Sequence, residues 1–338
     1  MPSNSAAWLV EPKAHPFQVK EAPIWEPSTN ELLVKNHALA INPVDGSIQT
    51  KAWFPLNYPT ILGQDIAGEV IKVGPNVTRF KPGDRILGHA LGMATKRDQD
   101  AAFQAYTILT TNMASHIPDG ISYEAAAVLP LGLSTAACGL FQEDFLNLEY
   151  PTPARNKPTG KALLVWGGAS SVGSNAIQLA AAAGYEVYTT ASPKNFTYVK
   201  TLGAVHAFDY NSLTIADDLV AALSGKTLAG AIDCIGLSAT PVTVDVVLRS
   251  SGVKLVSTVK PGFQAPEGVT VKFIFGTSLK DNDVGKAIYE DFLPEALKAK
   301  TFVPAPEPLV VGKGLGSLQE AVDLQAKGTS ARKVVVPL

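Results

Sequence analysis

Cysteine is scarce in this chain, which has two cysteines among 338 residues, Cys138 and Cys234. Two cysteines cannot build the disulfide framework of a small secreted protein or a zinc lobe with four cysteine ligands. Both lie in apolar segments, where a small core residue is the simplest interpretation. A reducing compartment fits this composition, so the sequence predicts a cytoplasmic protein.

The chain also lacks an excess of charge of one sign. Its 28 Lys and Arg residues against 30 Asp and Glu residues leave a formal net charge of −2. This balance gives no electrostatic reason to expect nucleic acid or an anionic membrane as a partner. The N-terminal region has no long apolar segment typical of a secretory signal. The most apolar stretch, 125–141, is short, contains Pro130 and is rich in small residues, so we expect no membrane span.

Long helical patterns are absent from the first third, where short apolar or alternating runs are separated by turn residues. The turns fall at 74–76, 81–84 and 118–120. We therefore expect a compact β domain without helices here. The predicted strands are Ala6–Val10, Glu31–Ile41, Asp65–Val73, Arg85–Ala90 and Phe103–Leu109.

Strands and helices alternate in the middle of the chain. The apolar run Ala162–Trp166 is followed by a Gly- and Ser-rich turn, 167–173, and a small-residue helix, Val172–Ala183. This order brings backbone N–H groups to a pyrophosphate at a helix N-terminus. The alternation predicts an α/β fold with a doubly wound parallel sheet. Further strands are expected at Glu186–Ala191, His206–Tyr210, Gly230–Ile235, Val253–Val259 and Lys272–Gly276, and the tail predicts helices at Asp283–Lys300 and Ser317–Lys327 before a last strand, Lys333–Val336.

A first motif carries a family resemblance. The run LGQDIAGEVIKVG at 62–74, followed by FKPGDR at 80–85, resembles the N-terminal domain of the medium-chain dehydrogenase/reductases. The resemblance covers essentially the whole chain, because the glycine turn follows in the expected order. It implies a GroES-like β domain made of residues 1–126 and 277–338, and a Rossmann domain that binds the cofactor, residues 127–276.

The same motif departs from the zinc-dependent members of that superfamily. They carry Gly-His-Glu where this chain has Gly63-Gln64-Asp65, and a ligand cysteine near the position of Asn42. Glutamine is not a usual zinc ligand, and the five histidines have no ligand-like spacing. The sequence therefore predicts no metal.

Other stretches, 41–45, 129–136, 191–196 and 208–210, resemble the zinc-less quinone oxidoreductase and enoyl reductase branch, notably fungal CipB-like oxidoreductases and, more distantly, trans-acting polyketide enoyl reductases. Related sequences often carry Lys where this chain has Ser47, so the resemblance gives no firm proton donor. It implies that Asn42, Asp45, Ser47 and Thr135 position the nicotinamide and substrate. The cofactor-binding residues that it implies are Val44, Asp45, Ser47, Thr135, Gly168, Ala169, Ser170, Ser171, Val172, Ser192, Lys194, Asn195, Tyr210, Ile235, Gly236, Lys333 and Val334.

The choice of nucleotide depends on the end of the second strand of the Rossmann domain. NAD-specific domains usually place Asp or Glu about 20 residues after the glycine turn, where it binds the ribose hydroxyls. Residues 189–195 contain no acid, whereas Ser192, Lys194 and Asn195 offer donors to a 2′-phosphate. The alternative is a polar loop that only caps the next helix. We expect NADPH.

Without a zinc ion, the charge formed on an isolated carbonyl oxygen is harder to stabilise. Hydride addition to a conjugated C=C gives a delocalised enolate that a few N–H or O–H donors can stabilise. The sequence thus favours an NADPH-dependent, metal-independent reductase of an enone, enoyl thioester or quinone, acting as a monomer or homodimer. A zinc-less carbonyl reductase or alcohol dehydrogenase, and a non-catalytic NADPH-binding structural protein, stay open. The expected wall of the substrate site is Trp53, Phe54, Leu91, Met93, Phe275 and Leu279.

Overall fold

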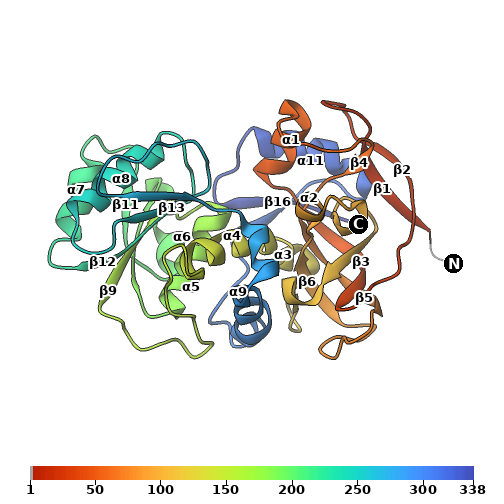
Figure 1. The fold of residues 1–338 in the computed structure, drawn as a ribbon, viewed down its shortest axis with the longest axis horizontal. Helices are drawn as coiled ribbons and strands as arrows, with labels where there is room; N and C mark the ends of the chain where they lie inside the picture. The colour runs from red at the N-terminus through yellow and green to blue at the C-terminus, as the bar shows by residue number, and fades with distance from the viewer. Residues whose placement is uncertain (1–2) are drawn as a thin grey trace. The chain divides into compact units, whose positions relative to one another are not determined.

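The computed structural model describes residues 3–338. The chain folds into two compact units, the first made of the residues up to Leu131 together with Glu307–Leu338, and the second of Gly132–Pro306 (Figure 1). The sequence had placed the return to the first domain at 277, which is too early. Residues 277–306 stay with the second unit, where Val303 exchanges two hydrogen bonds with Gln178 and Thr301 Oγ1 donates to Pro153 O.

The first unit contains two β-sheets. A small sheet pairs its strands in the order β2-β1-β4, and a larger one in the order β15-β16-β3-β5-β6-β8, with β7 also paired to β3. Ala40 of β3 pairs with Asp65 of β5 on one side and with Val335 of β16 on the other. The strands are β1 (Asn4–Leu9), β2 (Gln18–Ala22), β3 (Glu31–Ala40), β4 (Thr60–Ile61), β5 (Asp65–Val73), β6 (Arg85–His89), β7 (Tyr106–Thr110), β8 (Ala114–His116), β15 (Glu307–Val310) and β16 (Arg332–Pro337).

Helices also occur in the first unit, so the expectation of a β domain without helices is wrong. Helix α1 (Pro43–Lys51) begins with proline at its first turn, and its Asp45 carboxylate accepts a hydrogen bond from Asn42 N at 2.8 Å. It packs beside α11 (Leu318–Ala326), where a Cβ on Gly46 would lie 3.2 Å from Val322 Cγ1 (Figure 1). The shorter helices are α2 (Gly92–Thr95), η1 (Asp98–Asp100), η2 (Thr111–Met113), α3 (Tyr123–Ala126) and η6 (Leu315–Ser317).

The second unit is built on a six-stranded parallel sheet with the strand order β11-β10-β9-β12-β13-β14. Counted along the chain, this is the order 3-2-1-4-5-6 of a Rossmann sheet, which confirms the predicted fold class. Ligands of such sheets bind where the order reverses, here at the carboxyl ends of β9 and β12. The elements are β9 (Lys161–Trp166), α5 (Ser171–Ala182), β10 (Glu186–Ala191), η3 (Pro193–Asn195), α6 (Phe196–Thr201), β11 (Ala204–Asp209), α7 (Ile215–Ala222), β12 (Thr227–Asp233), α8 (Ala239–Arg249), β13 (Leu255–Thr258) and β14 (Thr270–Phe273).

The helix predicted at 283–300 is broken into three pieces. A π-helical turn, η5 (Ala287–Phe292), separates α9 (Asp283–Lys286) from α10 (Leu293–Lys298). Pro294 lies at the start of α10 and has no N–H to donate, so the regular ladder cannot continue through it. A short helix, η4 (Gly276–Asp281), precedes them.

Among residues 3–338, one helical stretch is long and apolar enough to cross a membrane. It covers Tyr123–Phe141, where α4 (Pro130–Phe141) follows α3, and has a mean hydropathy of 1.5. However, 83% of that stretch is buried inside the protein. The core helix of a soluble protein passes the same test, so this is weak evidence for a membrane span.

Candidate cofactor and substrate sites

The glycine turn after β9 leaves no room for a side chain at Gly168 or Gly173. A Cβ on Gly168 would lie 2.2 Å from Thr189 Oγ1 of the neighbouring strand, and one on Gly173 would lie 2.2 Å from Gly167 O. Gly167 itself has φ of 84°, a conformation that favours glycine. The turn therefore lies tightly between β9 and the start of α5, as the pyrophosphate-binding turn of a Rossmann fold does.

The N-terminal part of α5 carries buried polar atoms that have no hydrogen-bond partner in the described residues. Ser170 caps the helix, its Oγ accepting a hydrogen bond from Gly173 N at 3.0 Å. Ser171 Oγ and Asn175 Oδ1 are buried and have no hydrogen-bond partner among residues 3–338. Buried polar atoms are normally paired, and the Ser171 hydroxyl can donate to an oxygen-rich ligand at this helix end, whereas Asn175 Oδ1 is itself an acceptor. The residues of the turn thus fit the pyrophosphate of a nicotinamide cofactor.

At the end of β10, the polar side chains do not serve the following helices as caps. Asn195 Nδ2 donates to Ser192 Oγ at 3.2 Å, but neither side chain makes a capping hydrogen bond to η3 or α6. Lys194 is exposed at the same turn. This weakens the alternative that these residues only cap a helix.

A carboxylate that the sequence analysis missed lies beside this turn. Asp209, at the end of β11, is the register partner of Ala191 at the end of β10. Its Oδ1 accepts hydrogen bonds from Asn211 N and Nδ2 at 2.9 and 3.1 Å. Tyr210, next in the chain, has 47% of its surface exposed. The sequence of β10 itself contains no acid at this end, whereas parallel pairing brings one from the next strand.

The loop after β12 is positioned by a second residue that was missed, Asp233. Its buried Oδ1 accepts hydrogen bonds from Ile235 N and Gly236 N at 3.0 and 2.9 Å, and Oδ2 accepts one from Thr240 Oγ1 at 2.6 Å. A Cβ on Gly167 would lie 2.5 Å from Ile235 Cγ1, so this loop adjoins the glycine turn at the reversal of strand order. The sequence signal that could have identified Asp233 is an acidic residue at the carboxyl end of a predicted strand.

A buried polar cluster forms in the first unit where β3, β5 and β16 meet. Lys333 has only 4% of its surface exposed, and its Nζ lies 2.9 Å from Oδ2 of the fully buried Asp65. Lys333 Nζ also donates to Asn42 Oδ1, while Asn42 Nδ2 donates to Asp65 Oδ2 at 2.9 Å. Leu131 N donates to the other oxygen, Asp65 Oδ1, at 2.6 Å. The ammonium group of Lys333 therefore balances the charge of the buried Asp65 carboxylate, and both oxygens of that carboxylate accept hydrogen bonds.

These donors do not fit a zinc ion. Asn42 and Gln64 offer amide groups, and the carboxylate of Asp65 already binds the ammonium of Lys333. Zinc in proteins is bound by thiolate, imidazole and carboxylate groups. In the part of the chain that the structure describes, no group of three or more His, Cys, Asp and Glu side chains is placed to hold a metal.

Two further titratable groups of this region are buried. The pKa of Asp45 is raised from 3.8 to about 7, mainly by burial and in part by nearby Asp65, while the Asn42 N–H and Lys333 oppose the rise. Burial lowers the pKa of His89 from 6.5 to about 4, and its Nε2 lies 3.4 Å from Gln64 Oε1. Near neutral pH, then, Asp45 is close to its midpoint and His89 is neutral.

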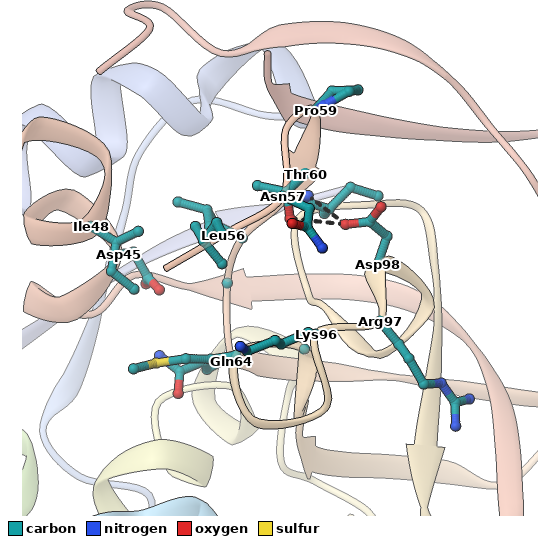
Figure 2. A pocket seen from close by; sticks show the side chains of 15 residues that line it. Asp45, Ile48, Leu56, Asn57, Pro59, Thr60, Gln64, Lys96, Arg97 and Asp98 are labelled. Carbon is teal, nitrogen blue, oxygen red and sulfur yellow. Dashed lines mark hydrogen bonds between the residues drawn. The ribbon is translucent and has the colours of Figure 1, made fainter. Parts of the chain in front are cut away.

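A cavity of about 230 Å³ lies within the first unit (Figure 2). In that view Asp45 and Gln64 lie on one side of it, and Thr60 and Asp98 lie on the other. Apolar side chains complete the wall, among them Ile48, Leu56 and Met93. Of the six residues expected to form a substrate wall, Met93 alone lines this cavity. Trp53 is 53% exposed, and Phe275 and Leu279 belong to the second unit.

The predicted site residues divide between the two units. Asn42, Val44, Asp45 and Ser47 lie at the start of α1, and Lys333 and Val334 lie on β16 in the same unit. The structure gathers Asn42, Asp45 and Lys333 in the polar cluster, while Ser47 Oγ accepts a hydrogen bond from Trp53 Nε1 at 3.0 Å. The second unit holds Thr135 on α4, together with Gly168, Ala169, Ser170, Ser171, Val172, Ser192, Lys194, Asn195, Tyr210, Ile235 and Gly236.

Comparison with known proteins agrees with this architecture. The family described as "Alcohol dehydrogenase GroES-like domain" matches residues 28–128, and the family described as "Zinc-binding dehydrogenase" matches residues 171–278. The chain belongs to the medium-chain dehydrogenase/reductases, as its sequence motifs indicated. It is an oxidoreductase of that type, and enzymes of this family bind nicotinamide cofactors.

Its relatives include fungal CipB-like dehydrogenases and trans-enoyl reductases. The zinc-binding alcohol dehydrogenase domain-containing protein cipB of Emericella nidulans is 69% identical over 336 residues, covering 99% of this chain and 98% of that protein. The trans-enoyl reductase himH of Aspergillus japonicus is 38% identical over 339 residues, covering 99% and 97%. The crystal structure of CurK enoyl reductase has a TM-score of 0.78 over 99% of both chains, and at 19% identity it shows the fold alone.

The buried pair makes a first prediction. Replacing Lys333 with Met leaves the Asp65 carboxylate buried without its cation, which costs about 3–5 kcal/mol of unfolding free energy. The double variant Lys333→Met with Asp65→Asn removes both charges and recovers a large part of that loss. Urea denaturation of the three proteins measures it. Equal stability of Lys333→Met and the unchanged protein would show that the pair is not coupled.

The shifted pKa values of Asp45 and His89 predict opposite effects of pH on stability. Raising the pH from 4 to 7 ionises Asp45 more readily in the unfolded chain, so its contribution to stability is lost over this range. His89 binds its proton more readily in the unfolded chain, so the contribution of His89 to the unfolding free energy increases as the pH rises from 4 to 6.5.

The variant Asp45→Asn removes the first effect and keeps the second. Its unfolding free energy therefore rises with pH more steeply than that of the unchanged protein, by a difference on the order of 2–4 kcal/mol between pH 4 and 7. Urea denaturation at several pH values measures both slopes. Parallel slopes would contradict the assigned shift of Asp45.

Proposed function

We propose that this protein is an NADPH-dependent, metal-independent reductase that transfers hydride to a C=C bond conjugated with a carbonyl group, or to a quinone. The observation that carries the proposal is the buried cluster of Lys333, Asp65 and Asn42, which presents an internal ammonium and two bonded acceptors instead of zinc ligands. The trans-enoyl reductase himH and the fold shared with CurK enoyl reductase support a reductase role.

Bound NADPH would supply the hydride. The backbone of the turn at Gly168–Val172 and the hydroxyls of Ser170 and Ser171 would hold its pyrophosphate at the N-terminus of α5. The loop at Ile235–Gly236, fixed by Asp233, would hold the nicotinamide half at the reversal of strand order. Asn42, Ser47 and Thr135 would orient the reacting groups, as the family resemblance implies.

The type of substrate follows from where charge develops. Reduction of an isolated carbonyl group concentrates negative charge on one oxygen, which a metal ion usually stabilises. A conjugated acceptor spreads that charge over an enolate, which hydrogen-bond donors stabilise adequately. The cluster in the first unit holds an ammonium group in place of a set of metal ligands, so we infer a conjugated acceptor. We infer a small-molecule substrate, a cytoplasmic location and a monomeric or homodimeric state.

A screen of electron acceptors tests the proposed reaction. The purified protein should oxidise NADPH with an enone, an enoyl thioester or a quinone at least tenfold faster than with a simple aldehyde, because only the first three delocalise the charge. Absorbance at 340 nm follows the oxidation. Faster reduction of the aldehyde would favour the carbonyl reductase, and no turnover with any acceptor would favour a structural protein.

The preference for NADPH is tested at Lys194. Replacing Lys194 with Ala removes a charged donor to the 2′-phosphate, so the Kd for NADPH should rise about tenfold or more while the Kd for NADH stays unchanged. Lys200→Ala is the matched control, since Lys200 is an exposed lysine on the adjacent helix α6. Fluorescence titration measures both constants. An unchanged ratio of the two constants in Lys194→Ala would remove Lys194 from the nucleotide site.

A further inference from the structure

We propose that Asp45 is the acid that protonates the reduced substrate, and that the cavity of the first unit is where it meets that substrate. This inference rests on the proposed reductase function and names the residue that the family resemblance left open. Asp45 lines the cavity, although only 1% of its surface is exposed, so its carboxyl group is shielded from bulk water.

The carboxyl group is held in a fixed orientation. Its Oδ2 accepts the backbone hydrogen bond of Asn42 at 2.8 Å, and its carboxyl also bonds to the amide of Gln64, which lies on the same side of the cavity in Figure 2. Helix α1 positions it from its first turn. A general acid needs such a fixed orientation toward the atom it protonates.

The other titratable groups of the cavity wall are less suited to give up a proton. Arg97 is paired with Glu31 and Asp100. Asp98 accepts hydrogen bonds from Thr60 Oγ1 and Ile61 N. Lys96 is exposed. Asp45 is the carboxyl group of this wall whose pKa burial raises to about 7.

The charged groups around Asp45 support this assignment. Asp65 on β5 and Lys333 on β16 neutralise each other, and His89 on β6 is neutral above its lowered pKa of about 4. Gln64, between Asp45 and His89, carries no charge, and Asp323 on the neighbouring α11 pairs with His15 on the exposed side. Near pH 7, Asp45 is therefore the group of this cluster that gains or loses a proton.

In the proposed reaction, the carbon at the far end of the conjugated C=C would accept a hydride, with both its electrons, from the reduced nicotinamide, and the π electrons would move toward the carbonyl group. The carbon next to the carbonyl group then takes the proton of the Asp45 carboxyl group, which becomes a carboxylate. The product is the saturated carbonyl compound and the oxidised nicotinamide. A proton from water restores the acid.

The pH profile of the unchanged enzyme is the first test. With a 2-methyl enone as substrate, kcat/KM should be constant below pH 7 and fall tenfold per unit at higher pH, as Asp45 loses its proton. This test needs no variant. A value of kcat/KM that is independent of pH between 6 and 9 overturns the proposal.

The second test is the variant Asp45→Asn, whose amide oxygen can still accept the hydrogen bond of Asn42. Its kcat should fall about 100-fold or more, the break near pH 7 should disappear, and the Kd for NADPH should stay within twofold. Asp100→Asn is the matched control, because Asp100 is also a buried carboxyl group with a raised pKa but lies outside the cavity wall. It should keep the rate and the pH profile.

Each result separates the two proposals. A slow Asp45→Asn enzyme that keeps the break near pH 7 shows a merely structural role and overturns the assignment of Asp45, as does a variant with full activity. In both cases the reductase function stands, because the unchanged enzyme is active. An unchanged enzyme that reduces no conjugated acceptor overturns the reductase function, and the inference with it.

Discussion

The buried contact between Lys333 and Asp65 is the constraint on which the candidate site of the first unit depends. It joins the last strand of the chain to a strand of the N-terminal region, and Asn42, 291 positions from Lys333, bonds to both partners. A buried carboxylate without a cation would be costly, so the chain must return from the second unit to supply one. The same contact fixes Asn42, and through Asn42 the start of α1 and the carboxyl group of Asp45.

This arrangement explains how a fold shared with zinc-binding dehydrogenases would work without zinc. In a metal enzyme, the cation is an open coordination site that polarises the substrate. Here the cation is the ammonium of Lys333, whose hydrogen bonds to Asp65 and Asn42 are already made, so it balances charge without offering an open site. In the proposed reaction, hydrogen-bond donors and a neutral acid would therefore stabilise the charge that forms on the substrate. Asp45 would be that acid because burial opposes its ionisation and the nearby carboxylate of Asp65 opposes it too.

Much of the fold could be predicted because its signals are local. The strand Asp65–Val73 has the predicted bounds, and the glycine turn with its flanking strand and helix was found from apolar runs and small residues. Helix α1 was missed because its nine residues carry hardly any apolar periodicity, and its place is set by close packing of Gly46 on α11. Pro294 is a local signal for the broken helix, whereas the return of the chain at Glu307 depends on packing within the second unit, which no local pattern records.

The site was less predictable from the sequence, because it depends on contacts between residues that are far apart in the chain. The resemblance named Asn42, Asp45 and Lys333, but the contact of Lys333 with Asp65 requires knowing that β16 and β5 flank β3. Asp209 and Asp233 were missed because their roles arise from strand pairing and from loop hydrogen bonds.

The central claim, that reduction proceeds without a metal, is tested most directly by measuring zinc content and activity of the same sample after dialysis against a chelator. The account predicts full NADPH-dependent reduction of a conjugated acceptor with far less than one zinc ion per chain. Activity that disappears with the metal and returns with stoichiometric zinc would contradict it.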